Sequence, residues 1–302
     1  MMKIGVVIQL VEMPDLRRAL SWSEIKDTVQ VVEGLGFDSI WVYDHLLYRN
    51  KSKTTGIWEG WSMLSAMAAT TQEVELGTLV SCNSFRNPAL LAKMAHTVDE
   101  ISGGRLILGI GAGWNQPEYE AFGFPFDHRA SRFEEAIQII HPLIKTGKVD
   151  FSGKYYQVIN CEISPTSPRK EGIPLLISAF GPKMMKLAAQ FADMWNVCYM
   201  SFPRSSKKLT RSFRLACQEM GREFETIIKT YTIHLAFPDL LGWNKDKKRG
   251  FMSGSAEEIA IIIKEYEDLG SEHLMFHLSP STLEAYRRLA KAVNLYKSLN
   301  ST

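Results

Sequence analysis

Short apolar runs alternate with longer amphipathic stretches along the whole sequence, and this alternation restricts the possible folds more than any other feature. The runs with the length and composition of buried strands are 3–9, 38–43, 74–80, 105–110, 174–178, 193–198, 227–235 and 273–278. The stretches with helical periodicity are 21–35, 60–71, 88–101, 131–146, 182–191, 204–220, 255–269 and 282–298. Such alternation is typical of parallel strands with helices outside them. In a chain of 302 residues it favours a closed α/β barrel, the (β/α)8 TIM barrel, over an open doubly wound sheet.

Two segments do not fit the repeat. Residues 111–130, after the fourth strand, form a long excursion rich in aromatic residues and containing prolines. Residues 148–172 alternate like a hairpin around Ser152-Gly153 and then become a proline-containing loop. Barrel enzymes carry their sites at the carboxyl ends of the strands, so we expect insertions on the C-terminal face. Nothing divides the sequence into parts, and we predict a single domain over residues 1–302.

Charge and cysteine content argue against several classes of partner. The 35 basic and 33 acidic residues give a net charge of +2, so we expect no nucleic-acid or membrane-surface partner, and the basic segment 244–250 is interpreted as a solvated loop. No segment approaches the about 20 continuous apolar residues of a membrane span, and the N-terminal run is too short for a signal peptide. The cysteines have neither metal-binding nor disulfide spacing, which predicts no metal site and a cytoplasmic location. They are Cys82, Cys161, Cys198 and Cys217.

The fourth strand ends in a run of glycines that invites comparison with a dinucleotide-binding turn. Gly109, Gly111 and Gly113 are followed by Trp114 and Pro117, so no helix starts inside the motif. A Rossmann turn also belongs to the first strand of its unit, and this interpretation is therefore weak. Two interpretations remain open from the spacing: a strand end where a flat ring approaches the backbone, or a tight turn without a ligand.

Two further strand ends carry candidate functional groups. Asp44 and His45 follow the second strand, where a polar pair is placed for catalysis or ligand orientation. The alternative is that Asp44 caps a turn and His45 binds a backbone carbonyl. Gly181-Pro182 opens a helix beside Lys183, which is typical of a phosphate site but also of an ordinary strand–helix joint.

The third strand ends in small and hydroxyl side chains, which would allow a ring to lie against the backbone. Arg86 then precedes a helix that has Pro88 in its first turn. For this arginine, an exposed or structurally paired side chain is favoured over a contact with an anionic ligand.

Taken together, these segments resemble the bacterial luciferase-like superfamily, and most closely its branch that uses the deazaflavin coenzyme F420. The most specific parts of the resemblance are "WVYDH" at 41–45, the segment 77–114, "EYEAFGFPF" at 118–126 and "GPKMMKLAAQFADMWN" at 181–196. The resemblance implies that a deazaflavin or isoalloxazine ring lies in the mouth of the barrel. It also implies a bulge in the third strand with a non-proline cis peptide at Leu79–Val80, and it makes the glycine run a wall for the ring.

The family's contacts carry over onto residues of this sequence. The implied contacts with the ring are Asp44, Leu79, Val80, Cys82, Ala112 and Gly113. The implied contacts with the phosphate tail are Phe180, Gly181, Lys183 and Met184. His45 matches a proton donor or ring-side polar group of the deazaflavin-dependent sugar-phosphate dehydrogenases. Those enzymes carry a glutamate where this sequence has Trp114, so their substrate and mechanism are not transferred.

The resemblance implies an oxidoreductase that transfers a hydride between F420 and a small organic substrate, with His45 moving the proton and Asp44 orienting the ring. One alternative is an FMN-dependent monooxygenase that uses reduced flavin and oxygen. Another is a flavin-binding protein without catalysis, against which the intact polar pair argues. The Asp-His pair favours F420 over FMN. Because relatives are usually dimers, a homodimer is expected.

Overall fold

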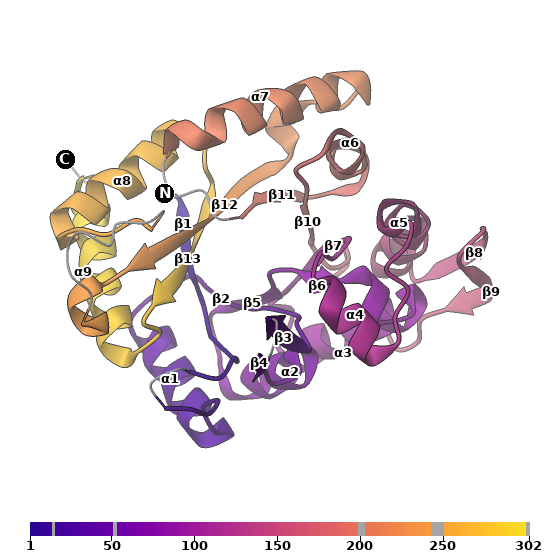
Figure 1. Cartoon of the computed structure of the whole chain (residues 1–302). Helices are drawn as coiled ribbons and strands as arrows, with labels where there is room; N and C mark the ends of the chain where they lie inside the picture. Colours follow the sequence, from indigo (N-terminus) through magenta and orange to yellow (C-terminus); the bar gives the residue numbers. More distant parts are fainter. Residues whose placement is uncertain (14–15, 51–52, 199–202, 243–250, 300–302) are drawn as a thin grey trace. The chain divides into compact units, whose positions relative to one another are not determined.

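The predicted strands and helices are all present in the computed structural model, which describes residues 1–13, 16–50, 53–198, 203–242 and 251–299 (Figure 1). The predicted strands are β1 (Lys3–Val7), β2 (Ser39–Val42), β5 (Glu75–Thr78), β7 (Leu106–Gly111), β10 (Leu175–Ser178), β11 (Met194–Val197), β12 (Ile228–Ala236) and β13 (His273–Ser279). The predicted helices are α1 (Trp22–Gly34), α2 (Gly60–Thr70), α3 (Pro88–Ile101), α5 (Arg129–Thr146), α6 (Pro182–Phe191), α7 (Pro203–Glu219), α8 (Ala256–Asp268) and α9 (Leu283–Leu299). The basic segment 244–250 lies outside the described residues.

The chain forms two compact units. The first unit comprises Met1–Gln9, Lys26–Trp41 and Ser178–Thr302, and the second comprises Leu10–Ile25 and Val42–Ile177. None of the described helices is long and apolar enough to cross a membrane.

In the first unit, parallel strands follow the order β11–β12–β13–β1–β2. One face of this sheet packs against helices: Trp195 of β11 stacks on Phe213 of α7 with ring centroids 4.2 Å apart. Tyr231 of β12 packs on Tyr266 of α8 at 5.6 Å. Side chains alternate across a strand, so Thr230, Thr232 and His234 lie on the opposite face of β12.

In the second unit, β7 is buried along its whole length and pairs in parallel with β5 and β10. The ladder continues from β5 into the short strand β6 (Ser81–Cys82), which also pairs with β7. Between β5 and β6 the chain bulges, and the Leu79–Val80 peptide is cis, as the resemblance implies.

The insertions take three forms. The hairpin β3 (Leu47–Asn50) and β4 (Lys53–Gly56) follows β2 directly and was not predicted. The short helix α4 (Gln116–Phe122) follows β7 within the predicted excursion.

The predicted second hairpin is also present, as β8 (Lys148–Ser152) and β9 (Gln157–Glu162). This hairpin begins after α5 and lies beside that helix (Figure 1). Its turn is held against the helix because the carboxylate of Glu135 in α5 accepts hydrogen bonds from the backbone of residues 154–156.

Candidate active site

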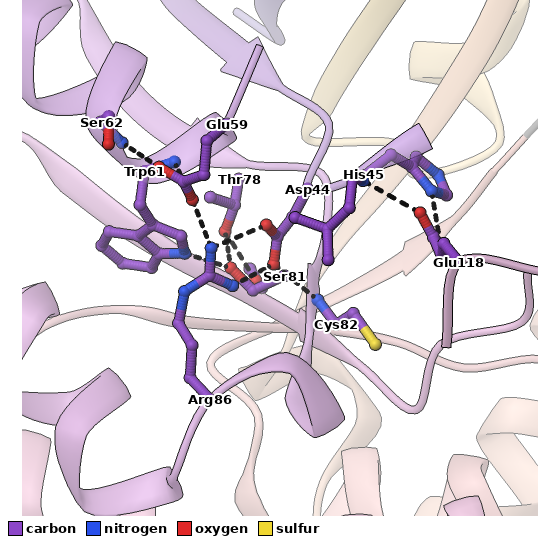
Figure 2. A network of polar contacts seen from close by, with 12 residues as sticks. Asp44, His45, Glu59, Trp61, Ser62, Thr78, Ser81, Cys82, Arg86 and Glu118 are labelled. Carbon is purple, nitrogen blue, oxygen red and sulfur yellow. Dashed lines mark hydrogen bonds and ion pairs between the residues drawn. The ribbon is translucent and has the colours of Figure 1, made fainter. Parts of the chain in front are cut away.

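Asp44, at the carboxyl end of β2, is the centre of a buried ion-pair network in the second unit (Figure 2). Its Oδ2 accepts hydrogen bonds from Arg86 Nη1 at 2.6 Å and from the Cys82 backbone N–H at 3.0 Å. Its Oδ1 accepts a further bond from Arg86 Nη2 at 3.0 Å. Burial raises the pKa of the Asp44 carboxyl, and the Arg86 guanidinium opposes that effect. Because both oxygens bind protein donors, Asp44 fixes the bulge; its contact with a cofactor ring stays a prediction.

Arg86 connects this carboxylate to the start of the next helix. Its Nη2 also contacts Oε1 of Glu59, which caps α2 by accepting hydrogen bonds from the backbone N–H groups of Trp61 and Ser62 at 3.1 and 2.7 Å. Burial lowers the pKa of the Arg86 guanidinium, but the carboxylates of Asp44 and Glu59 outweigh burial and raise that pKa above its ordinary value. The prediction of a structurally paired arginine is confirmed. Because the Arg86 guanidinium already binds two carboxylates, a contact between Arg86 and an anionic ligand is disfavoured.

A chain of hydrogen bonds holds the bulge from its other side (Figure 2). Trp61 Nε1 donates to Ser81 Oγ at 2.9 Å, and Ser81 Oγ donates to Thr78 Oγ1 at 3.0 Å. Thr78 Oγ1 in turn donates to the Gly109 carbonyl at 2.7 Å. All four residues are buried, so the bulge between Thr78 and Ser81 is rigidly supported by side chains that have no contact with solvent.

The glycine run is required by packing against this bulge. A Cβ at Gly109 would overlap the Thr78 carbonyl oxygen, and a Cβ at Gly111 would lie 2.9 Å from Val80 Cγ2. At Gly113, where φ is +76°, a Cβ would overlap the Tyr119 hydroxyl. Packing alone therefore explains why side chains are absent at these three positions, and the approach of a ring to this backbone stays a prediction. The space is filled by the bulge, which presents the half-buried Val80 side chain in their place.

Cys82 belongs to an aromatic cluster beside the bulge, and the backbone of Ala112 is hydrogen-bonded to that cluster. Cys82 Sγ lies 2.8 Å from the Tyr119 hydroxyl, which donates to the Ala112 carbonyl at 3.0 Å. Burial raises the pKa of the Cys82 thiol to about 12, so the sulfur is protonated and is not a nucleophile at neutral pH. The structure therefore brings the predicted ring contacts of the second unit together around one bulge, with Cys82 acting through packing.

His45 is held by a carboxylate that sequence reasoning did not single out. Its Nδ1 lies 2.9 Å from Oε1 of Glu118 in α4, and Oε2 of Glu118 accepts the Leu46 backbone N–H at 3.0 Å (Figure 2). The rings of Tyr48 and Trp114 flank the imidazole, with centroids 4.6 and 5.5 Å from it. A carboxylate on Nδ1 keeps the proton there in the neutral ring and leaves Nε2 for proton exchange.

Asn83 is a second residue that sequence reasoning missed. It follows Cys82, is fully buried, and neither of its amide atoms has a hydrogen-bond partner among the described residues. Burial raises the pKa of the Tyr156 hydroxyl, and the Asn83 side chain opposes that effect. Buried polar groups are nearly always paired, so an unsatisfied amide beside the bulge fits a site whose ligand supplies the partner.

The predicted tail contacts lie in the first unit, at the start of α6. Phe180, Gly181 and Lys183 are exposed and Met184 is half-buried. A Cβ at Gly181 would meet nothing within 4 Å, and its φ of −88° is open to any residue. Neither packing nor conformation therefore requires this glycine, unlike Gly109. A phosphate at this helix start stays a prediction.

Comparison with known proteins identifies the class. A family model described as luciferase-like monooxygenase matches residues 2–239. The chain therefore belongs to the luciferase-like monooxygenase family, and it is an enzyme of that family.

Individual relatives carry different activities in their names. The 5,10-methylenetetrahydromethanopterin reductase of Archaeoglobus fulgidus is 33% identical over 64% of this chain, a match that spans 52% of the reductase. The F420-dependent glucose-6-phosphate dehydrogenase of Amycolatopsis mediterranei is 27% identical over 81% of this chain and 85% of its own. The pyrimidine monooxygenase RutA of Stutzerimonas stutzeri is 29% identical over 67% of this chain, and the match spans 58% of RutA.

Solved structures establish the fold. An F420-dependent secondary alcohol dehydrogenase in complex with an F420-acetone adduct aligns with a TM-score of 0.81, covering 98% of this chain and 99% of its own at 20% identity. The EDTA monooxygenase EmoA of Chelativorans sp. BNC1 aligns with a TM-score of 0.82, covering 100% and 95% at 12% identity. The predicted (β/α)8 barrel is confirmed.

Proposed function

We propose that this enzyme is an F420-dependent oxidoreductase that transfers a hydride between the deazaflavin and a small organic substrate. The observation that carries the proposal is the pair of His45 and Glu118 beside the β5–β6 bulge. This pair supplies a proton-transfer group whose tautomer is fixed. Such a group is required because hydride transfer between a carbonyl compound and an alcohol also moves a proton to or from the oxygen.

The residues around the bulge fit a flavin-type ring. Val80 would lie against the ring face, and the unsatisfied amide of Asn83 would bind a polar edge. Ala112 and Gly113 complete the same wall. For the first unit, we propose a phosphate site at the start of α6, with Gly181 and Lys183. When bound, the deazaflavin supplies the hydride acceptor and donor chemistry.

The chain's own residues supply proton transfer. In the oxidation of an alcohol, Nε2 of His45 accepts the hydroxyl proton as the hydride leaves the carbon. The Glu118 carboxylate stabilises the imidazolium that forms and keeps the imidazole in one orientation. In the reverse direction, Nε2 returns the proton to the carbonyl oxygen.

The relatives support both the proposal and its alternative. The dehydrogenase of Amycolatopsis mediterranei carries F420 in its name, and this favours the deazaflavin. The pyrimidine monooxygenases are monooxygenases by name, and this favours the monooxygenase alternative. We do not propose glucose 6-phosphate as the substrate, because Trp114 stands where the resemblance places a glutamate of the sugar-phosphate enzymes. The homodimer, the single domain and the cytoplasmic location stay predictions.

Fluorescence titration of the purified protein with F420 and FMN tests the cofactor. We expect tighter binding of F420. Tighter binding of FMN would overturn the proposal in favour of the monooxygenase.

A further inference from the structure

A pair of histidines lies at the carboxyl ends of β12 and β13. His234 and His277 are register partners on neighbouring parallel strands, so their side chains emerge side by side from the same face of the sheet. Their ring centroids are 4.3 Å apart, and both residues are half-buried. The pair lies wholly within the first unit. The carboxyl ends of barrel strands are where enzymes of this fold carry their sites.

The pair is connected to two further polar side chains. Gln9, which follows β1, donates from Nε2 to Nε2 of His277 at 2.9 Å and to the Leu278 carbonyl at 2.9 Å. Because the amide nitrogen can only donate, Nε2 of His277 is the acceptor, and the proton of this imidazole is on Nδ1. Nε2 of His234 lies 2.7 Å from Ser279 Oγ. Both rings are thus held in fixed orientations.

The face below the pair is polar as well. Asn196 Nδ2 donates to Thr230 Oγ1 at 2.8 Å and to Thr232 Oγ1 at 3.3 Å, and Cys198 Sγ donates to Asn196 Oδ1 at 3.1 Å. The interior of a (β/α)8 barrel is usually filled by branched apolar side chains. A hydrogen-bonded polar layer leading up to two histidines is therefore a departure that packing alone does not explain.

An aromatic ring borders the pair. Phe251 packs edge-on against His234 with centroids 4.1 Å apart. Its neighbour Met252 is attached to β12, since its backbone N–H donates to the His234 carbonyl at 2.9 Å and its carbonyl accepts from Ala236 at 2.8 Å. The contact of His234 with Ser279 uses Nε2, so Nδ1 is the ring nitrogen through which a ligand would bind.

The imidazoles are uncharged at neutral pH. Burial lowers the pKa of His234 to about 4. Burial and the neighbouring His234 lower the pKa of His277 to about 3. Two neutral imidazoles, an amide and a hydroxyl can match donors and acceptors but provide no opposite charge for an anion, and a partly buried anion without one is strongly disfavoured.

We propose that His234, His277, Gln9 and Ser279 form a substrate subsite that binds an uncharged hydrogen-bonding group, such as a carbonyl, a hydroxyl or an amide. This inference rests on the proposed oxidoreductase function for the identity of the ligand as a substrate. It adds the substrate class: a neutral polar molecule in preference to a carboxylate or a phosphate.

Nuclear magnetic resonance of protein labelled with ¹³C and ¹⁵N at its seven histidines tests the subsite. Acetamide and acetate are matched probes that differ chiefly in charge. At pH 7 we expect acetamide to shift the ring signals of His234 and His277 saturably, with acetate binding at least about tenfold more weakly. The signal of the exposed His128, in the second unit, serves as the control and should not move.

Variants make the test specific. His234→Asn keeps a hydrogen-bonding group and should retain acetamide binding, whereas His234→Phe should abolish the shift of His277. If His234→Phe does not fold, Ser279→Ala, which removes only the hydroxyl, should weaken acetamide binding. Equal or tighter binding of acetate, or no saturable shift with acetamide, would overturn the proposal. Measurements with and without F420 or FMN keep this result separate from cofactor binding, whose failure would overturn only the proposed function.

Discussion

Replacing Glu118 with glutamine tests the proposed proton transfer without removing the histidine. In the wild type, the two carboxylate oxygens accept from two donors, His45 Nδ1–H at 2.9 Å and the Leu46 N–H at 3.0 Å. A glutamine has one acceptor oxygen and one donor NH2 group. The backbone N–H of Leu46 can only donate, so it keeps the oxygen, and the NH2 group turns to Nδ1 of His45.

This exchange reverses the tautomer of the imidazole. With a donor facing Nδ1, that nitrogen becomes the acceptor and the proton moves to Nε2, which then cannot accept the substrate proton. The Glu118 side chain is 2% exposed, so water does not take the place of the lost carboxylate. We expect turnover to fall by about 10²- to 10⁴-fold, the range for loss of general acid–base catalysis or for a wrong tautomer. The number of hydrogen bonds is unchanged, so the free energy of unfolding should change by less than about 1 kcal/mol.

The assay is single-turnover oxidation or reduction of bound cofactor, followed by absorbance. His45→Ala should be as slow as Glu118→Gln, and His45→Asn, which keeps a hydrogen bond but cannot titrate, should not recover the rate. In the His45→Ala background, Glu118→Gln should have little further effect, because both changes remove the same function. Wild-type turnover of Glu118→Gln would refute the assignment of Glu118 as the residue that positions His45.

Two further changes address the proposed cofactor site. Asn83→Leu removes two unsatisfied buried atoms, so it should raise the free energy of unfolding by about 1–3 kcal/mol while weakening cofactor binding. The control Asn196→Leu breaks a satisfied network and should lower the free energy of unfolding. Lower stability of Asn83→Leu with unchanged binding would make Asn83 structural. Gly181→Val should weaken F420 or FMN binding but hardly affect riboflavin, which lacks the phosphate, and an equal loss for all three would mean that the tail lies elsewhere.

The barrel elements were predictable because their periodicity is strong. Buried strands of a parallel sheet are almost continuously apolar, as β7 shows, and the helices carry one apolar stripe each. The β3–β4 hairpin was missed because its sequence, LYRN and KTTG, is mostly polar and has no clear alternation of apolar residues. Its pairing depends on the fold around it more than on local pattern.

The site was predictable only where its residues belong to one motif. Asp44, His45 and the bulge at Leu79–Val80 follow strand ends that the sequence marks clearly. The partners of the first two are remote: Glu118 is 73 residues from His45, and Arg86 is 42 residues from Asp44. A carboxylate at the start of a short helix is common in any sequence, and nothing local marks Glu118 as the partner of an imidazole.

The glycines show most clearly what spacing can and cannot predict. The sequence shows that side chains are absent at 109, 111 and 113, but it does not show what occupies the space. At these positions the occupant is the protein itself, namely the Thr78 carbonyl, the Val80 side chain and the Tyr119 hydroxyl. Gly181 is the contrasting case, since packing leaves the space beside it open. Of these four glycines, Gly181 is therefore the one that packing does not explain, and it is the position at which an added side chain tests the cofactor directly.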